Sequence, residues 1–156
     1  MGKNFNDLKD VPGLYKIFST VDGSKCLDVR GISRQDRADI ILFEDNGQEN
    51  QNFYLKYAGD GYFVIVAQHS GKVLDIMGLD PQPRAKIIQF EYNGGDNQLW
   101  RLKISPEGSF VIQSKLNGFV LDVFENRTEN ETRIISFPFH GGENQKFILK
   151  NIGFEI

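Results

Sequence analysis

A short phrase, Asn-Gln followed by an aromatic residue two places on, occurs three times at constant spacing. Its glutamines Gln51, Gln98 and Gln145 are separated by 98 − 51 = 47 and 145 − 98 = 47 residues. The same shift superposes further positions without any insertion or deletion: Leu27-Asp28, Leu74-Asp75 and Leu121-Asp122; Ile40-Ile41, Ile87-Ile88 and Ile134-Ile135; Phe43, Phe90 and Phe137; Gly47, Gly94 and Gly141. A fixed period of this length indicates a repeat architecture in which each unit is one supersecondary element.

Each unit contains four short runs rich in β-branched and aromatic residues. Turn residues such as Gly, Asn, Asp and Pro bound these runs, which is typical of strands. The runs are YKIF, CLDV, IILF and FYLKY in the first unit, YFVIV, VLDI, IIQF and WRLKI in the second, and SFVIQ, VLDV, IISF and FILK in the third. We therefore predict an all-β chain of about twelve strands.

The repeat also predicts how these strands are arranged. A four-stranded unit of about 45 residues cannot cover its own apolar face, whereas three units closed around a pseudo-threefold axis can, and closure removes free sheet edges. We predict a single β-trefoil domain over residues 1–156, with repeats at about 13–58, 60–105 and 107–151. A three-bladed propeller is the alternative, and it is disfavoured because its axial hole would be too small to be useful.

Composition excludes several classes of protein. The 18 basic residues are scattered, so we expect no nucleic-acid partner. The longest apolar run, YFVIVA at 62–67, is far short of a membrane span, so we expect no membrane insertion. Cys26 is the single cysteine, which rules out an internal disulfide framework. Together with the absence of a signal-peptide pattern in the first ten residues, this predicts a cytoplasmic or non-classically secreted protein.

The repeated motifs resemble those of the ricin-B-type β-trefoil lectins, a carbohydrate-binding family with three Gln-x-Trp repeats. The resemblance covers residues 13–151 and rests on the LD dipeptides followed by NQNF, NQLW and NQKF in the same order in every unit. It departs from the family at Cys26, because the position where many members carry the partner cysteine holds Asp45 here.

Six residues of the motif are expected to be structural. The resemblance implies that the glutamines hydrogen-bond backbone within their own unit, and the aromatic residues should be buried, where each covers about 150–250 Å². These structural residues are Gln51, Phe53, Gln98, Trp100, Gln145 and Phe147.

The resemblance implies one shallow sugar site per unit, formed by an aspartate, a phenylalanine, an asparagine and one lateral polar residue. The three sets are Asp28, Phe43, Asn46 and Asn50; Asp75, Phe90, Asn93 and Asn97; and Asp122, Phe137, His140 and Asn144. Because residues alternate faces along an extended strand, we expect Asp75 and Asn97 to point away from the core and Asp75 to be exposed. The alternative role for these aspartates is turn capping.

The residue types suit a sugar. A carboxylate accepts charge-assisted hydrogen bonds from neighbouring hydroxyls, an aromatic ring covers the apolar face of a pyranose, and an amide both donates and accepts. We predict a multivalent, non-catalytic lectin for glycans of galactose or N-acetylgalactosamine type, with no cofactor and no metal. The three sites need not share one sugar, because Arg30, Met77 and Phe124, two residues after each aspartate, differ.

Two other functions fit the sequence less well. Catalysis is disfavoured because the three aspartates belong to different units and cannot form the closely spaced pair that glycoside hydrolysis uses. A protein-binding trefoil, resembling a protease inhibitor or a signalling factor, would need one protruding loop rather than a set of polar residues repeated three times. The sequence leaves the sugar, the number of active sites and the oligomeric state open.

Overall fold

The computed structural model describes residues 13–154 and contains twelve strands in that range. The strands are β1 (Gly13–Ser19), β2 (Lys25–Val29), β3 (Ile40–Glu44), β4 (Phe53–Gly59), β5 (Tyr62–Ala67), β6 (Val73–Ile76), β7 (Ala85–Phe90), β8 (Trp100–Ile104), β9 (Phe110–Ser114), β10 (Val120–Val123), β11 (Thr132–Phe137) and β12 (Phe147–Phe154). Every predicted run forms a strand. Residues 1–12 and 155–156 of the predicted domain lie outside the described residues.

Six of these strands form a barrel. The hairpins β4–β5 and β8–β9 are joined to each other through β5–β8, and β1 and β12 pair with each other over most of their length. Contacts β1–β4 and β9–β12 complete the ring. All of these pairings are antiparallel, and the ring joins the first and last described strands of the chain.

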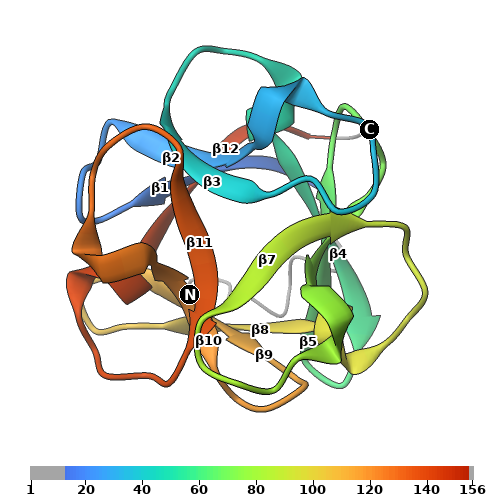
Figure 1. The fold of residues 1–156 in the computed structure, drawn as a ribbon. Coiled ribbons are helices and arrows are strands. Elements are labelled where there is room, and N and C mark those ends of the chain that lie inside the picture. Colours follow the sequence, from blue (N-terminus) through green and yellow to red (C-terminus); the bar gives the residue numbers. More distant parts are fainter. Residues whose placement is uncertain (1–12, 155–156) are drawn as a thin grey trace.

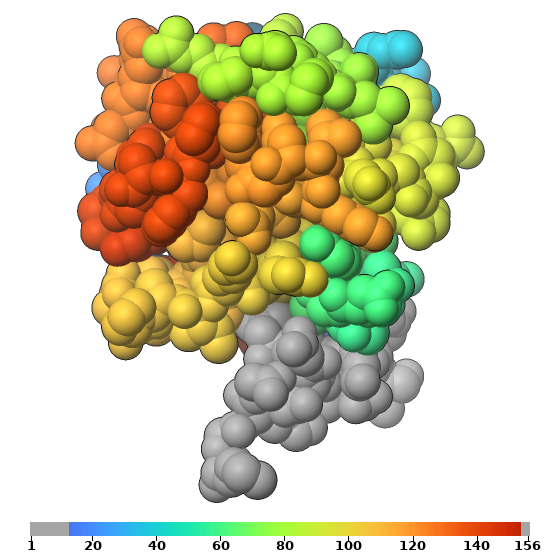
Figure 2. All heavy atoms as spheres, turned by 90° about the horizontal axis from the view of Figure 1, so that it is seen from below, coloured from blue at the N-terminus to red at the C-terminus, as the bar shows by residue number. Residues whose placement is uncertain are grey.

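The other six strands form three hairpins that cover one end of the barrel. They are β2–β3, β6–β7 and β10–β11, and Figure 1 shows them arranged around a threefold axis that points toward the viewer. In the side view of Figure 2 the segment that follows β6 (light green) lies at the top, and the turn between β8 and β9 (gold) lies near the opposite end. This is a β-trefoil, as predicted.

Two sets of short 3-10 helices interrupt each unit at equivalent places. One set follows the second strand of the unit: η2 (Arg30–Ile32), η4 (Met77–Leu79) and η6 (Phe124–Asn126). The other set precedes the fourth strand: η3 (Glu49–Gln51), η5 (Asp96–Gln98) and η7 (Glu143–Gln145). The second set contains the repeated Asn-Gln pairs, so these pairs lie in a turn rather than in an extended strand.

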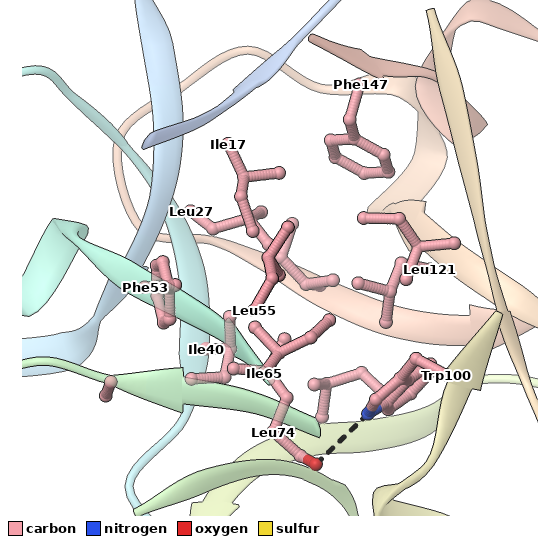
Figure 3. Packing of buried hydrophobic residues seen from close by; sticks show 14 of the residues in the cluster. Ile17, Leu27, Ile40, Phe53, Leu55, Ile65, Leu74, Trp100, Leu121 and Phe147 are labelled. Carbon is pink, nitrogen blue, oxygen red and sulfur yellow. Dashed lines mark hydrogen bonds between the residues drawn. The ribbon is translucent and has the colours of Figure 1, made fainter. Parts of the chain in front are cut away.

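The core lies inside the barrel and beneath the hairpins. Trp100, Phe53 and Phe147 are fully buried, as expected from the repeat, and they pack with the leucines of the three Leu-Asp pairs (Figure 3). The indole Nε1–H of Trp100 donates to the Leu74 carbonyl oxygen at 3.2 Å, which satisfies its polar atom. Cys26 is also buried with its thiol free, and burial raises the pKa of this thiol to about 12. Among residues 13–154 no helix is long and apolar enough to cross a membrane.

Replacing Trp100 tests this description of the core. Trp100→Ala should lower the free energy of unfolding by about 3–5 kcal/mol, because it opens a large cavity. Trp100→Phe should cost less, since Phe fills the equivalent positions 53 and 147, although it leaves the Leu74 carbonyl without its indole donor. Urea unfolding of the three proteins measures both effects. A loss below about 1 kcal/mol for Trp100→Ala would contradict the observed packing.

Candidate carbohydrate-binding sites

Each unit contains one pocket beside its Leu-Asp strand, and each pocket contains all four residues of one predicted site. Site 1 has a volume of about 300 Å³ and includes Asp28, Phe43, Asn46 and Asn50. Site 2, of about 500 Å³, includes Asp75, Phe90, Asn93 and Asn97. Site 3, of about 130 Å³, includes Asp122, Phe137, His140 and Asn144. The structure therefore brings together every set that the sequence predicted to converge.

The expectation that Asp75 is exposed is wrong, and its equivalents Asp28 and Asp122 are buried in the same way. Asp28, Asp75 and Asp122 are each only 3% exposed. Leu74 does point into the core and Asp75 does point away from it, but the far side of the strand is covered by the 3-10 turn that contains Asn97 and Gln98. The alternation argument also failed for Asn97 itself, because this residue is helical rather than extended and is buried.

The buried carboxylate is held by the glutamine of its own unit. Gln51 donates through Nε2 to Asp28 Oδ2 at 2.9 Å and to the Glu44 carbonyl at 2.9 Å, and its Oε1 accepts the Asn46 backbone N–H at 3.0 Å. Gln98 and Gln145 make the same three kinds of bond. The glutamines thus bond backbone within their unit, as the resemblance implied, and they also bond the site aspartate, which it did not imply.

The asparagine of each unit supports the same carboxylate from the other side. Asn50 Nδ2 donates to Asp28 Oδ1 at 3.1 Å and to the Val29 carbonyl at 2.9 Å, and Asn144 repeats both bonds with Asp122 and Val123. In the second unit, Asn97 Nδ2 donates to the Ile76 carbonyl at 3.0 Å. We call this arrangement of aspartate, glutamine and asparagine the amide–carboxylate network. It fixes the carboxylate before any ligand arrives.

The lateral polar residue shapes the loop that borders each pocket. Asn93 Oδ1 accepts the Gly95 N–H at 2.8 Å, and His140 Nδ1 accepts the Gly142 N–H at 3.0 Å. A Cβ on Gly95 would lie 2.7 Å from Asn97 Oδ1, so glycine keeps this wall of site 2 open. These residues therefore hold the loop as well as facing the pocket.

Burial acts on the ionisation of the aspartates. Desolvation raises the pKa of Asp28 to about 6, against the opposing effect of the bonds from Gln51 and Asn50, and nearby Glu131 raises it further. The pKa values of Asp75 and Asp122 are also raised, again mainly by burial. At pH 7 Asp28 is mostly ionised and can accept hydrogen bonds, and it loses this capacity below about pH 6.

The sequence analysis did not predict the charged residue that a neighbouring unit adds to each pocket. Arg37 of the first unit lines site 2, Arg84 of the second unit lines site 3, and Glu131 of the third unit lines site 1, so each comes from the neighbouring unit on the same side around the threefold axis. These positions are separated by 84 − 37 = 47 and 131 − 84 = 47 residues, so the period contained the signal. Their loops differ in sequence from unit to unit, and the contact depends on how neighbouring units pack.

The fold and these three equivalent pockets define a β-trefoil of lectin type. The family model described as "ricin-type beta-trefoil lectin domain-like" matches residues 4–90, 49–137 and 96–155. The chain belongs to this family, and family and fold together support carbohydrate binding. A search of curated proteins finds no sequence match.

Solved structures give the same fold. The designed threefold symmetric protein ThreeFoil has a TM-score of 0.86 and 38% identity, over 88% of this chain and 97% of that one. An exo-β-1,3-galactanase from Clostridium thermocellum has a TM-score of 0.87 and 34% identity, over 90% of this chain but only 30% of the galactanase. The C-terminal half of an earthworm R-type lectin, solved with GalNAc, has a TM-score of 0.68 and 24% identity, over 89% and 98% of the two chains.

The network predicts that Asp75→Ala destabilises the protein. The substitution removes the acceptor of Gln98 Nε2 inside a buried cluster, and an unsatisfied buried donor costs about 1–3 kcal/mol. Glu91→Ala, an exposed carboxylate of the same unit, is the matched control and should change stability by less than about 0.5 kcal/mol. Thermal and urea unfolding measure both. Equal stability of the two variants would show that the network contributes nothing to folding.

The raised pKa of Asp28 predicts a pH dependence of stability. Its folded pKa, about 6, lies above the ordinary aspartate value of 3.8, so the folded state holds the proton more tightly. The contribution that this tighter proton binding makes to the free energy of unfolding is complete below about pH 3.8, and it is lost as the pH rises through about 6. The stability difference between the natural protein and Asp28→Asn should therefore change across this window. Carboxyl NMR should show a midpoint near 6, and a midpoint at or below 4 would contradict the prediction.

Proposed function

We propose that this protein is a multivalent, non-catalytic lectin with one shallow sugar site in each unit and a preference for galactose or N-acetylgalactosamine. The observation that supports it most strongly is the recurrence of one arrangement. An aspartate, a phenylalanine, an asparagine and a lateral polar side chain line a single pocket in all three units.

The network leaves hydrogen-bonding capacity for a ligand. In site 1 each oxygen of Asp28 accepts one amide N–H, and a carboxylate oxygen has a second lone pair for a sugar hydroxyl. Asn50 Oδ1 is buried without a donor among the described residues, and Asn50 lines the same pocket. Phe43 is half-buried on the third strand, where its ring can cover the C–H face of a pyranose. The fixed carboxylate lowers the entropy cost of binding.

The galactose preference is supported by the resemblance to ricin-B-type lectins and by two of the solved structures. One is named as acting on β-1,3-galactan, and the other was solved with GalNAc. The galactanase is a much longer chain, and its activity is a property of that whole protein. In site 2 the aspartate Asp75 is the only carboxylate among the residues that line the pocket, so this site lacks the pair of carboxylates used in glycoside hydrolysis.

Calorimetry and glycan arrays test the proposal. A shallow site should bind methyl galactoside with a Kd near ~1 mM, and three sites on one rigid domain should gain about 10²–10⁴ in apparent affinity for a dense galactosylated surface. Sub-micromolar binding of the monosaccharide would contradict the model of shallow sites. Chelation should leave binding intact, because among residues 13–154 no three His, Cys, Asp or Glu side chains form a group that could hold a metal.

Ring substitutions separate binding from folding. The triple variant Phe43→Leu, Phe90→Leu and Phe137→Leu keeps an apolar side chain at each site but loses the flat ring, so affinity should fall at least about tenfold, or about 1.4 kcal/mol per site. Phe139→Leu is the control, since this phenylalanine is exposed and lines none of the three sites. A triple variant that binds galactosylated surfaces as well as the control would refute the proposed sites.

A further inference from the structure

The three pockets differ in charge at the position contributed by the neighbouring unit. This position holds Arg37 in site 2, Arg84 in site 3 and Glu131 in site 1. The backbone is alike in all three places: φ is 73°, 71° and 73° in turn. Their N–H groups donate to the carbonyls of Gln89, Ser136 and Leu42 at 2.9, 2.7 and 2.8 Å. The side chain is therefore what distinguishes the pockets at this position.

Site 1 has no free cation at its rim. Glu131 Oε1 lies 2.9 Å from Arg30 Nε, so the guanidinium that lines this pocket is already paired with a carboxylate. Site 3 is lined by Arg84, which forms no salt bridge with a carboxylate of the described residues, by Asp122, and by Glu125, which is paired with Arg127 at 2.8 Å. Site 1 therefore offers no unopposed positive charge to a ligand, and in site 3 a second acidic residue lines the pocket together with the arginine.

Site 2 does offer an unopposed positive charge. Asp75 is the only acidic residue that lines it, and no carboxylate within the described residues forms a salt bridge with Arg37. The adjacent Asp36 is itself paired, with Lys72 at 3.0 Å. The Arg37 guanidinium carbon lies 5.5 Å from the centroid of the Phe90 ring, the ring expected to contact a sugar.

The loop that carries Arg37 is anchored in a way that the other two units lack. Gln89 is fully buried, and its Nε2 donates to the carbonyls of Ser33 and Gln35 at 2.8 and 2.7 Å. The equivalent residues, Leu42 and Ser136, cannot donate two such bonds. His69 Nε2 also bonds the Ser33 carbonyl, at 2.6 Å. In Figure 1 this loop, between η2 and β3, runs beside the end of β7. The arginine is thus held in place by its backbone.

We infer that site 2 recognises an acidic saccharide, a galactose-type sugar carrying a carboxylate, with Arg37 as the residue that sets this specificity. The inference rests on the proposed function. Asp75 accepts hydroxyl groups on one side of the Phe90 ring, while the guanidinium binds the ligand carboxylate in its planar, two-pronged geometry. Site 1, with Glu131 at the same position, disfavours that ligand and takes the neutral sugar.

A matched pair of ligands tests this inference: methyl galactopyranoside and methyl galactopyranosiduronate, which differ only at C6. Titrations followed by the backbone amide NMR signals of Gly95 and Gly31 report sites 2 and 1 separately, because each glycine lines one of them. At low salt the uronate should bind site 2 about fivefold more tightly than the neutral sugar, the scale of one partly exposed ion pair. At site 1 the order should reverse.

Arg37→Gln should abolish the preference at site 2, so that the ratio of the uronate affinity to the galactoside affinity falls from about fivefold to about one. Arg37→Lys should restore part of it, because lysine keeps the charge but not the planar fork. Arg34 is an exposed arginine of the same loop and lines none of the three sites, so Arg34→Gln should leave the affinity for both ligands unchanged.

The outcomes distinguish a failure of the proposed lectin function from a failure of the acidic specificity assigned to site 2. If neither sugar binds any site, the proposed function fails. If the galactoside binds but the uronate gains nothing at site 2, or if its advantage survives in Arg37→Gln, the assignment of acidic specificity to Arg37 is overturned and the neutral lectin sites stand.

Discussion

The hydrogen bond between each motif glutamine and its aspartate connects the fold to the sites. In the second unit Gln98 belongs to the turn before β8, and Asp75 belongs to β6, which forms part of the hairpin cap. The bond therefore joins barrel and cap within one unit, and its carboxylate faces the pocket. Because both partners are buried, removing either one leaves the other as an unsatisfied polar group and destabilises the protein.

The placement of the core and of the sites' main residues could be predicted from the sequence. A 47-residue period without gaps fixed the register of all three units, so one motif placed three pockets at once. Burial of Trp100 was expected from its place in the repeated motif together with its large apolar area. The alternation of residues between the two faces of a strand could not predict the burial of Asp75. A residue that points away from the core still becomes buried when a turn 21–23 positions later in the chain folds over it.

The contribution of Arg37 to site 2 could not be deduced from a single unit. It depends on packing between neighbouring units, namely the isolated bridge between Asp39 and Ile88 and the bond from Arg37 N–H to Gln89. The period marked the position, yet the side chain there changes sign between units. Equivalence in the repeat thus predicts where a residue lies, and the differences between repeats indicate which of three similar pockets does something distinct.

The pairing of β1 with β12 has a consequence for how the chain is made. Gly13 lies opposite Phe154, so the longest strand pair of the barrel joins residues at opposite ends of the described chain. During synthesis the first strand emerges from the ribosome long before its partner exists, and contacts of such high sequence separation form late. The cap hairpins, each made of two strands close in sequence, can form earlier. The cap half of a unit can therefore take shape while the barrel beneath it is still open.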